Sequence, residues 1–186
     1  WVQIPVLNNL TDTPIFMYYG NNTVSTDLSS TNIWTDPGYD GVWHLNNDFL
    51  DASGSGNNGV NYGATNQPAA HNFAGGQNFV DPNHWIELPN HTDRNGSFSY
   101  TGWVRTLNNA IAGQRIICDD QSNGPSCHAL SIGDPGAGRI RFYIRGLGPV
   151  SLDSPGGTII NNTWHYVAAT FDDLSNLKSL YVDGVL

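Results

Sequence analysis

The chain has 186 residues and a formal net charge of −9, with 39% hydrophobic and only 12% charged residues. This length suits one domain with an appendage, and six Trp, eight Tyr and seven Phe supply a packed core, which excludes a disordered chain. The acidic balance without a Lys/Arg run excludes a nucleic-acid-binding protein, and no run of 18 apolar residues predicts a membrane span.

The first 38 residues are predicted to lie outside the main domain. Two apolar runs, Trp1–Leu7 and Pro14–Tyr19, predict a β-hairpin within residues 1–20. The Ser/Thr/Asn-rich stretch 21–38 predicts a linker. Because a two-stranded hairpin cannot build a core alone, we expect it to pack on another part of the protein.

From residue 39 onward, short apolar runs alternate with turn-forming residues. One Glu and one Lys stand against 22 Asn and 21 Gly, and no apolar stripe keeps a helical period. We therefore predict an all-β fold over residues 39–186, an antiparallel β-sandwich. The expected strands are 41–45, 85–88, 97–106, 115–118, 128–132, 139–144, 164–171 and 179–182.

The run 164–171, WHYVAATF, shows the clearest strand pattern. His165, Val167, Ala169 and Phe171 fall on one face, and the alternate residues fall on the other. Residues 172–176 supply turn formers before the last strand. Three tryptophans at strand positions, Trp43, Trp103 and Trp164, are expected in the core.

Five segments in chain order resemble the landmarks of one family. They are YDGVWHLNN (39–47), DASGSGNNGVNYG (51–63), NFVDPNHWIELPN (78–90), FSYTGWVRT (98–106), and NTWHYVAATFDD with LKSLYVDGVL (162–186). Together they are similar to a laminin-G-like, concanavalin-A-like lectin domain, which implies a jelly-roll sandwich. The family continues for about thirty residues past its last hairpin, so we expect closing strands from further chain or from a partner.

The N-terminal runs WVQIPVL and PIFMYYGNN resemble the end of a domain of unknown function. That domain often precedes laminin-G-like modules in bacterial and archaeal surface proteins. The resemblance implies that this chain begins inside one module and ends inside the next.

Carboxylate chemistry is the first candidate activity, because this fold also hosts glucanases. Retaining glycoside hydrolysis needs two carboxylates about 5 Å apart. Glu87 is the sole Glu of the chain, and the Asp pairs 119–120 and 172–173 are adjacent, so their members fall on opposite strand faces. We predict that the protein is not an enzyme.

A cation site and a sugar site are the two predicted binding sites. Asp51, Ser53, Ser55 and Asn57 give an oxygen-rich loop that suits calcium, and similar family members hold calcium between the opening strand, this loop and a late Asp segment. Tyr62 at the twelfth position excludes an EF-hand, and a Gly/Asn turn without an ion remains the alternative. Trp85 and Glu87 share a strand face on which a sugar ring could stack, whereas a core position is the alternative for Trp85.

Several features indicate a secreted or cell-surface glycoprotein. Cys118 and Cys127 flank a turn-rich segment and are predicted to form a disulfide. Five glycosylation sequons lie in loop-like contexts, at Asn9, Asn21, Asn90, Asn95 and Asn161.

Three function classes fit these features. The favoured one is a non-catalytic recognition or adhesion module that binds a glycan or an extracellular protein. The alternatives are a structural subunit of an extracellular filament assembled from copies by β-strand complementation, and an accessory module of a polysaccharide-active enzyme.

Overall fold

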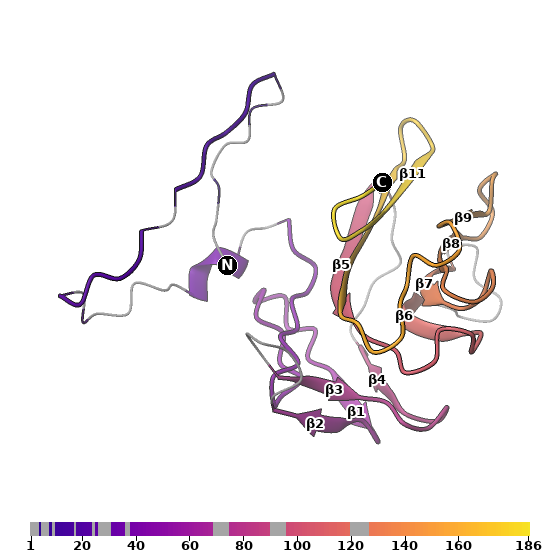
Figure 1. Ribbon diagram of the computed structural model, residues 1–186, viewed down its shortest axis with the longest axis horizontal. Helices are drawn as coiled ribbons and strands as arrows, with labels where there is room; N and C mark the ends of the chain where they lie inside the picture. The colour runs from indigo at the N-terminus through magenta and orange to yellow at the C-terminus, as the bar shows by residue number, and fades with distance from the viewer. Residues whose placement is uncertain are drawn as a thin grey trace. The chain divides into compact units, whose positions relative to one another are not determined.

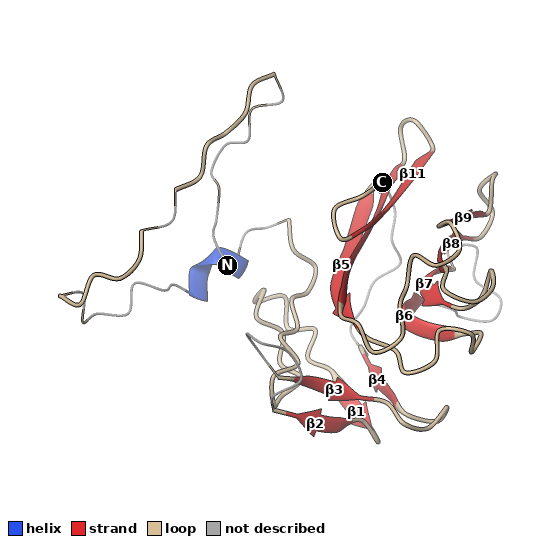
Figure 2. Cartoon of the chain, viewed as in Figure 1, coloured by secondary structure: helices blue, strands red, loops and turns tan. Residues whose placement is uncertain are grey.

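The computed structural model describes residues 4, 8, 10–16, 18–23, 25, 31–35, 38–68, 75–89, 96–119 and 127–186. Within these residues the fold is all-β, with one four-residue 3-10 helix, Thr31–Trp34, as its single helical segment (Figure 2). No described helix is long and apolar enough to cross a membrane. The chain divides into two compact units, Trp1–His91 and Thr92–Leu186.

The C-terminal unit is a two-layer antiparallel β-sandwich (Figure 1). One layer has three strands in the order β11-β10-β5: β5 (Phe98–Val104), β10 (His165–Asp172) and β11 (Leu177–Val182). The other layer has four strands in chain order: β6 (Gln114–Asp119), β7 (His128–Ile132), β8 (Ile140–Ile144) and β9 (Ser151–Asp153). The predicted antiparallel sandwich is confirmed.

The core of this unit lies between the two layers. Along β10 the residues His165, Val167, Ala169 and Phe171 are buried and the intervening ones are half-buried, as the alternation predicted. The opposite wall comes from the buried apolar residues of β7 and β8. The core cluster is Leu130, Ile132, Ile140, Phe142, Ile144, Ile159, Val167, Ala169, Phe171, Leu180 and Val182.

None of the three tryptophans expected in the core belongs to the buried core cluster, and Trp43 is half-buried. Trp103 is 40% exposed, because its neighbours in β5, Gly102 and Val104, pair with the core-facing residues of β10. Trp103 therefore lies on the outer face, against Tyr166. Trp164 is half-buried beneath the guanidinium of Arg105.

The N-terminal unit holds two short strand pairs. β1 (Val60–Tyr62) pairs with β4 (Trp85–Glu87), and β2 (Thr65–Gln67) pairs with β3 (Gly76–Asn78), both antiparallel. The strand expected at 41–45 is reduced to one isolated bridge between Trp43 and Asp51. A carboxylate loop, described below, takes the hydrogen bonds that a neighbouring strand would make.

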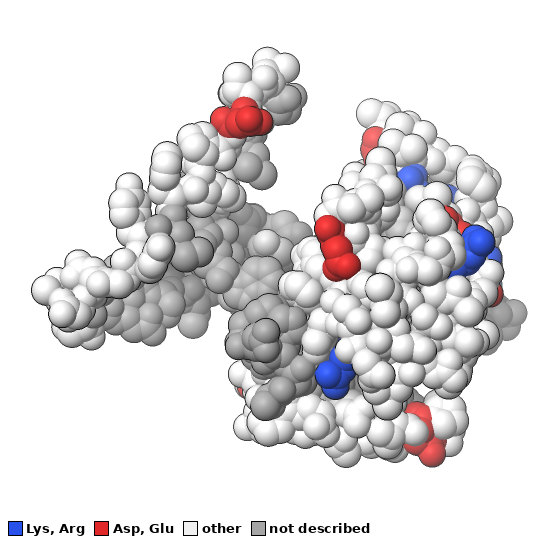
Figure 3. Space-filling view, viewed as in Figure 1, with Lys and Arg blue, Asp and Glu red and all other residues white. Residues whose placement is uncertain are grey.

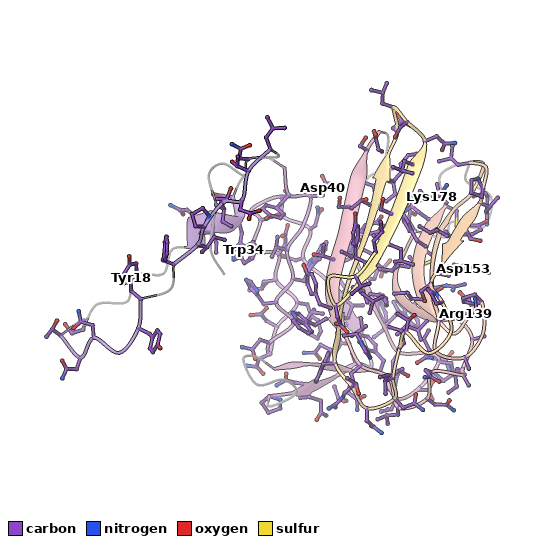
Figure 4. All side chains as sticks on the ribbon, turned by 45° about the horizontal axis from the view of Figure 1, so that its top comes forward. Tyr18, Trp34, Asp40, Arg139, Asp153 and Lys178 are labelled. Carbon is purple, nitrogen blue, oxygen red and sulfur yellow. The ribbon has the colours of Figure 1, made fainter. Side chains whose placement is uncertain are left out.

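Much of the predicted hairpin and linker lies outside the described residues, so both stay predictions. Residues 14–16, 18 and 19 carry no strand, and the expected partner 1–7 lies outside the described residues except for Ile4. The described side chains of this segment are exposed; Tyr18, for example, is 92% exposed (Figure 4). In the predicted linker, Trp34 makes edge-on contacts with Tyr39 and His44.

Candidate functional site

The N-terminal unit carries a ribbon with one solvent-exposed face. In the β1–β4 pair, Val60 lies opposite Glu87 and Tyr62 lies opposite Trp85. Side chains alternate across a strand, so these four residues share one face, which we call the aromatic platform. Val60, Tyr62 and Trp85 are 44%, 41% and 48% exposed. Trp85 and Glu87 were predicted as ligand residues; Tyr62 was not.

The two rings of the platform stack on each other. The centroids of Tyr62 and Trp85 are 4.7 Å apart and their planes differ by 15°. The nearby Glu87 carboxylate, through hydrogen bonding to the phenol and its negative charge, together with some desolvation, raises the pKa of Tyr62. The platform thus combines exposed aromatic surface with a neighbouring carboxylate.

Two glycines allow the platform to form. Gly63 follows Tyr62 with φ +85° and bridges to Trp85, and a Cβ there would come within 2.4 Å of the His84 ring. Gly59 precedes Val60, and a Cβ there would come within 2.7 Å of Ile86 on the buried side of the ribbon. Both ends of β1 therefore require glycine.

The predicted calcium loop precedes the platform and is centred on Asp51. One oxygen of this carboxylate accepts hydrogen bonds from the backbone N–H groups of Val42 and Ser53, each at 2.9 Å, and the other accepts one from Asn57 N–H at 3.0 Å. The indole of Trp43 donates to the carbonyl of Asn57 at 2.8 Å. Asp51 thus ties the loop to residues 42–43.

In this geometry the oxygens of the loop bind the loop's own backbone. A carboxylate has about four acceptor positions, and the N–H groups around Asp51 occupy three of them with their positive ends toward the oxygens. Ser53 Oγ accepts from Ser55 N–H, and Ser55 Oγ donates to Tyr39 O, so neither hydroxyl is directed at a shared centre. Among the described residues, no group of three or more His, Cys, Asp or Glu could hold a metal.

The predicted cysteine pair lies on the β6–β7 hairpin. Cys118 is paired with Ala129, so Cys127, two residues before Ala129, lies diagonally across on the same face. Diagonal neighbours are about 7–8 Å apart between Cα atoms, beyond the range of about 4.4–6.8 Å that a disulfide spans, so a bridge requires the backbone to move. The disulfide remains a prediction that titration of native thiols would test.

Two of the five predicted glycosylation sites are described. Asn21 and Asn161 are both exposed, and the side-chain carbonyl of Asn161 accepts a hydrogen bond from Asn109 N–H at 2.6 Å. This bond engages the side-chain oxygen of Asn161, whereas N-linked glycosylation modifies the side-chain nitrogen. Asn9, Asn90 and Asn95 lie outside the described residues.

The outer face of the four-stranded sheet carries carboxylates that each bind an arginine. Arg141 binds Asp153 through two bonds of 2.7 and 2.8 Å, and Arg115 and Ser131 both donate to Asp134. Burial opposes ionisation of Asp134, but these hydrogen bonds outweigh it and lower its pKa. A general acid needs a raised pKa, so the Asp134 carboxyl is not suited to that role.

A buried histidine joins the start of β10 to the end of β11. His165 Nδ1 lies 2.7 Å from Asp183, and its Nε2 accepts the N–H of Ile160 at 3.0 Å. With Nε2 acting as the acceptor, Nδ1 carries the proton and donates it to Asp183. Asp183 also accepts from Tyr166 N–H at 2.9 Å, so the pair fixes the last hairpin rather than offering a nucleophile.

We expect Asp183→Asn to lower the free energy of unfolding by about 1–2 kcal/mol, because it weakens a charged hydrogen bond to a buried group. Asn tolerates the left-handed conformation of residue 183, whose φ is +52°, so the substitution adds little strain of its own. Urea denaturation measures the change. Asp173→Asn, in the exposed turn before β11, is the control, and an equal loss in that variant would contradict the assigned role of Asp183.

Comparison with known proteins gives one family match. Residues 75–186, more than half of the chain, match a laminin-G-type family model described as the concanavalin A-like lectin/glucanases superfamily. No curated protein and no solved structure matched the chain.

Proposed function

Because this chain belongs to the concanavalin A-like lectin/glucanase superfamily, we propose that it is a non-catalytic recognition module that binds carbohydrate on the aromatic platform. The observation that carries the proposal is the stacked pair Tyr62–Trp85 with Glu87 beside it on an exposed ribbon face. Tyr62 and Trp85 are 41% and 48% exposed, although large aromatic side chains usually bury their apolar surface.

The chemistry of the platform suits a sugar ring. The C–H face of a pyranose is apolar and packs on an aromatic surface, while its hydroxyls need hydrogen-bond partners. Glu87 supplies acceptor oxygens, and its negative charge disfavours a uronate at the same position. Charged residues make up only 12% of the chain, and those visible in Figure 3 are scattered. We therefore assign a neutral or amino sugar as the ligand class.

We also propose that the protein hydrolyses no glycan. The single Glu87 cannot form a Glu–Glu acid/base pair, and Asp134 and Asp153 each hold an arginine. Extracellular placement belongs to the same proposal, supported by the exposed sequons at Asn21 and Asn161. Release of reducing ends from neutral polysaccharides would contradict the non-catalytic assignment.

Trp85→Ala tests the proposed sugar site. With the wild-type chain first screened against a panel of soluble neutral, amino and acidic oligosaccharides, we expect the variant to bind the best ligand about 10- to 30-fold more weakly, because it removes half of the stacking surface. Isothermal titration calorimetry gives the dissociation constants.

Trp103→Ala is the matched control, because Trp103 is 40% exposed in the other unit. It should leave the affinity unchanged. If no panel member binds the wild type, or if both substitutions weaken binding equally, the aromatic platform is not the sugar site.

A further inference from the structure

The positive charges of the chain are unevenly distributed between its two units. All seven Lys and Arg residues lie at position 94 or later, whereas residues 1–91 contain seven Asp and one Glu but no Lys or Arg. The N-terminal unit, which carries the aromatic platform, therefore has a formal charge of −8 out of −9 for the whole chain. A unit of this charge attracts cationic ligands and repels anionic ones.

The platform itself carries one of these negative charges on the same face as its rings. Glu87 is exposed, is two residues from Trp85 in β4, and lies diagonally opposite Tyr62 in β1. The hydrogen bonding and charge through which Glu87 raises the pKa of Tyr62 place the carboxylate beside the phenol. Because this pKa is raised, Tyr62 stays neutral at neutral pH, and Glu87 is the one charged residue of the platform.

The segments that flank the platform add carboxylates rather than basic side chains. Asp48 and Asp51 lie in the loop before β1, and Asp81 lies in the turn before β4. His84 directly precedes Trp85, and its ring lies against Gly63 at the end of β1. The described residues 38–68 and 75–89 include no Lys or Arg, so this part of the unit offers Glu87 no such partner.

A protonated amine on a sugar ring matches this arrangement. A cation is attracted to the face of an aromatic ring, most strongly to that of Trp, and an ammonium group donates charge-assisted hydrogen bonds to a carboxylate. The C–H face of the same sugar packs on the aromatic surface. Acetylation of the amine removes the positive charge and keeps the apolar face, so the two forms of one sugar differ in the group that Glu87 recognises.

We infer that the platform selects hexosamines with a free amine over the same sugars with the amine acetylated. This inference rests on the proposed function, because it takes the aromatic platform as the sugar site. The sugar ring packs on Trp85, and its ammonium group binds Glu87, two residues and about 7 Å further along β4. Trp85 thus contributes affinity for both forms, and Glu87 determines the preference between them.

The test compares two soluble tetramers, one of β-1,4-linked glucosamine and one of β-1,4-linked N-acetylglucosamine. Isothermal titration calorimetry of the full chain at about pH 5.5 gives both dissociation constants. We expect the wild type to bind the glucosamine tetramer at least about 10-fold more tightly, because a hydrogen bond between two charged groups contributes about this factor. Raising the salt concentration from about 50 to about 300 mM should weaken binding of the glucosamine tetramer and leave binding of the acetylated tetramer unchanged.

Glu87→Gln keeps the shape of the side chain and removes its charge. The variant should bind the glucosamine tetramer about 10-fold more weakly and the acetylated tetramer within about two-fold of the wild type. Asp48→Asn is the matched control, because it removes one charge from an exposed residue of the same unit outside the platform, and it should keep the preference. An equal loss in the two variants would mean that the overall charge of the unit, and not Glu87, attracts the amine, and would overturn the inference.

Tetralysine separates recognition of an amino sugar from recognition of charge alone, because it carries cationic amines without a sugar ring. We expect the wild type to bind it at least about 10-fold more weakly than the glucosamine tetramer, since it has no C–H face to pack on Trp85. Equal binding of the two would overturn the inference, and so would a wild type that binds both sugar tetramers equally or binds neither. The proposed function fails separately: if Trp85→Ala weakens binding of a neutral sugar from the wider panel, the sugar site stands even where the preference for an amine is absent.

Discussion

Phe142→Ala is expected to lower the free energy of unfolding of the C-terminal unit by about 3–5 kcal/mol. Phe142 is fully buried and lies on β8 between Leu130 and Leu152 of the neighbouring strands. Its ring also meets that of Phe98 from the opposite layer edge-on, with centroids 6.0 Å apart. Truncation therefore leaves a cavity bounded by both sheets, which cannot collapse without moving strands.

Guanidinium denaturation followed by circular dichroism measures this loss. Small domains are stable by about 5–15 kcal/mol, so the variant should unfold at a much lower denaturant concentration. Phe79→Ala is the matched control, because it removes the same atoms from a residue that is 49% exposed. Similar midpoints for the two variants would mean that Phe142 is not at the centre of the core.

The strands of the C-terminal unit were predictable because they have two unlike faces. Along 165–171, Val167, Ala169 and Phe171 on one face alternate with Tyr166, Ala168 and Thr170 on the other, and burial follows that alternation. β1, β2 and β9 have only three residues each, and none of these nine residues is buried. In such short, unburied strands the sequence shows no alternation of apolar and polar residues, so the sequence analysis does not predict them.

The aromatic platform was predictable in part. Trp85 and Glu87 are two residues apart, so a strand at that position puts them on one face whatever its partner. Tyr62 is 23 positions earlier in the chain, and only the register of β1 on β4 brings it to Trp85. Register between distant strands depends on tertiary packing, which local sequence does not encode.

The same limit applies to the carboxylate loop. Oxygen-bearing side chains at alternate positions are typical of calcium-binding loops. They are also typical of loops in which side-chain oxygens accept hydrogen bonds from the loop's own backbone, and the sequence does not distinguish the two. The contact that local sequence does not reveal is the hydrogen bond from the N–H of Val42, nine residues before Asp51.

Lys178 in the sandwich is a second residue whose environment depends on a distant contact. It is the single lysine of the chain and it is buried, and its Nζ donates a hydrogen bond to the carbonyl of Pro149 at 2.8 Å (Figure 4).

Asp51→Ala is expected to lower the free energy of unfolding by about 2–3 kcal/mol, because it leaves three backbone N–H groups without their acceptor. Asp48→Ala, at an exposed carboxylate three residues earlier, is the control and should cost less. If the loop held calcium instead, added calcium would raise the wild-type melting temperature and chelator would lower it. We expect neither change.

Acid should remove the stabilisation that Asp51 provides. Burial opposes its ionisation, but hydrogen bonds from Val42, Ser53 and Asn57 outweigh burial and lower the pKa of Asp51. An aspartate in the unfolded chain titrates near pH 3.9, so the contribution is complete above about that pH and is lost as the pH falls through the lower folded value. Urea denaturation at a series of pH values from 7 to 2.5 should therefore show a smaller acid-induced loss for Asp51→Ala than for the wild type. Parallel curves for the two proteins would show that the Asp51 carboxylate does not hold the loop.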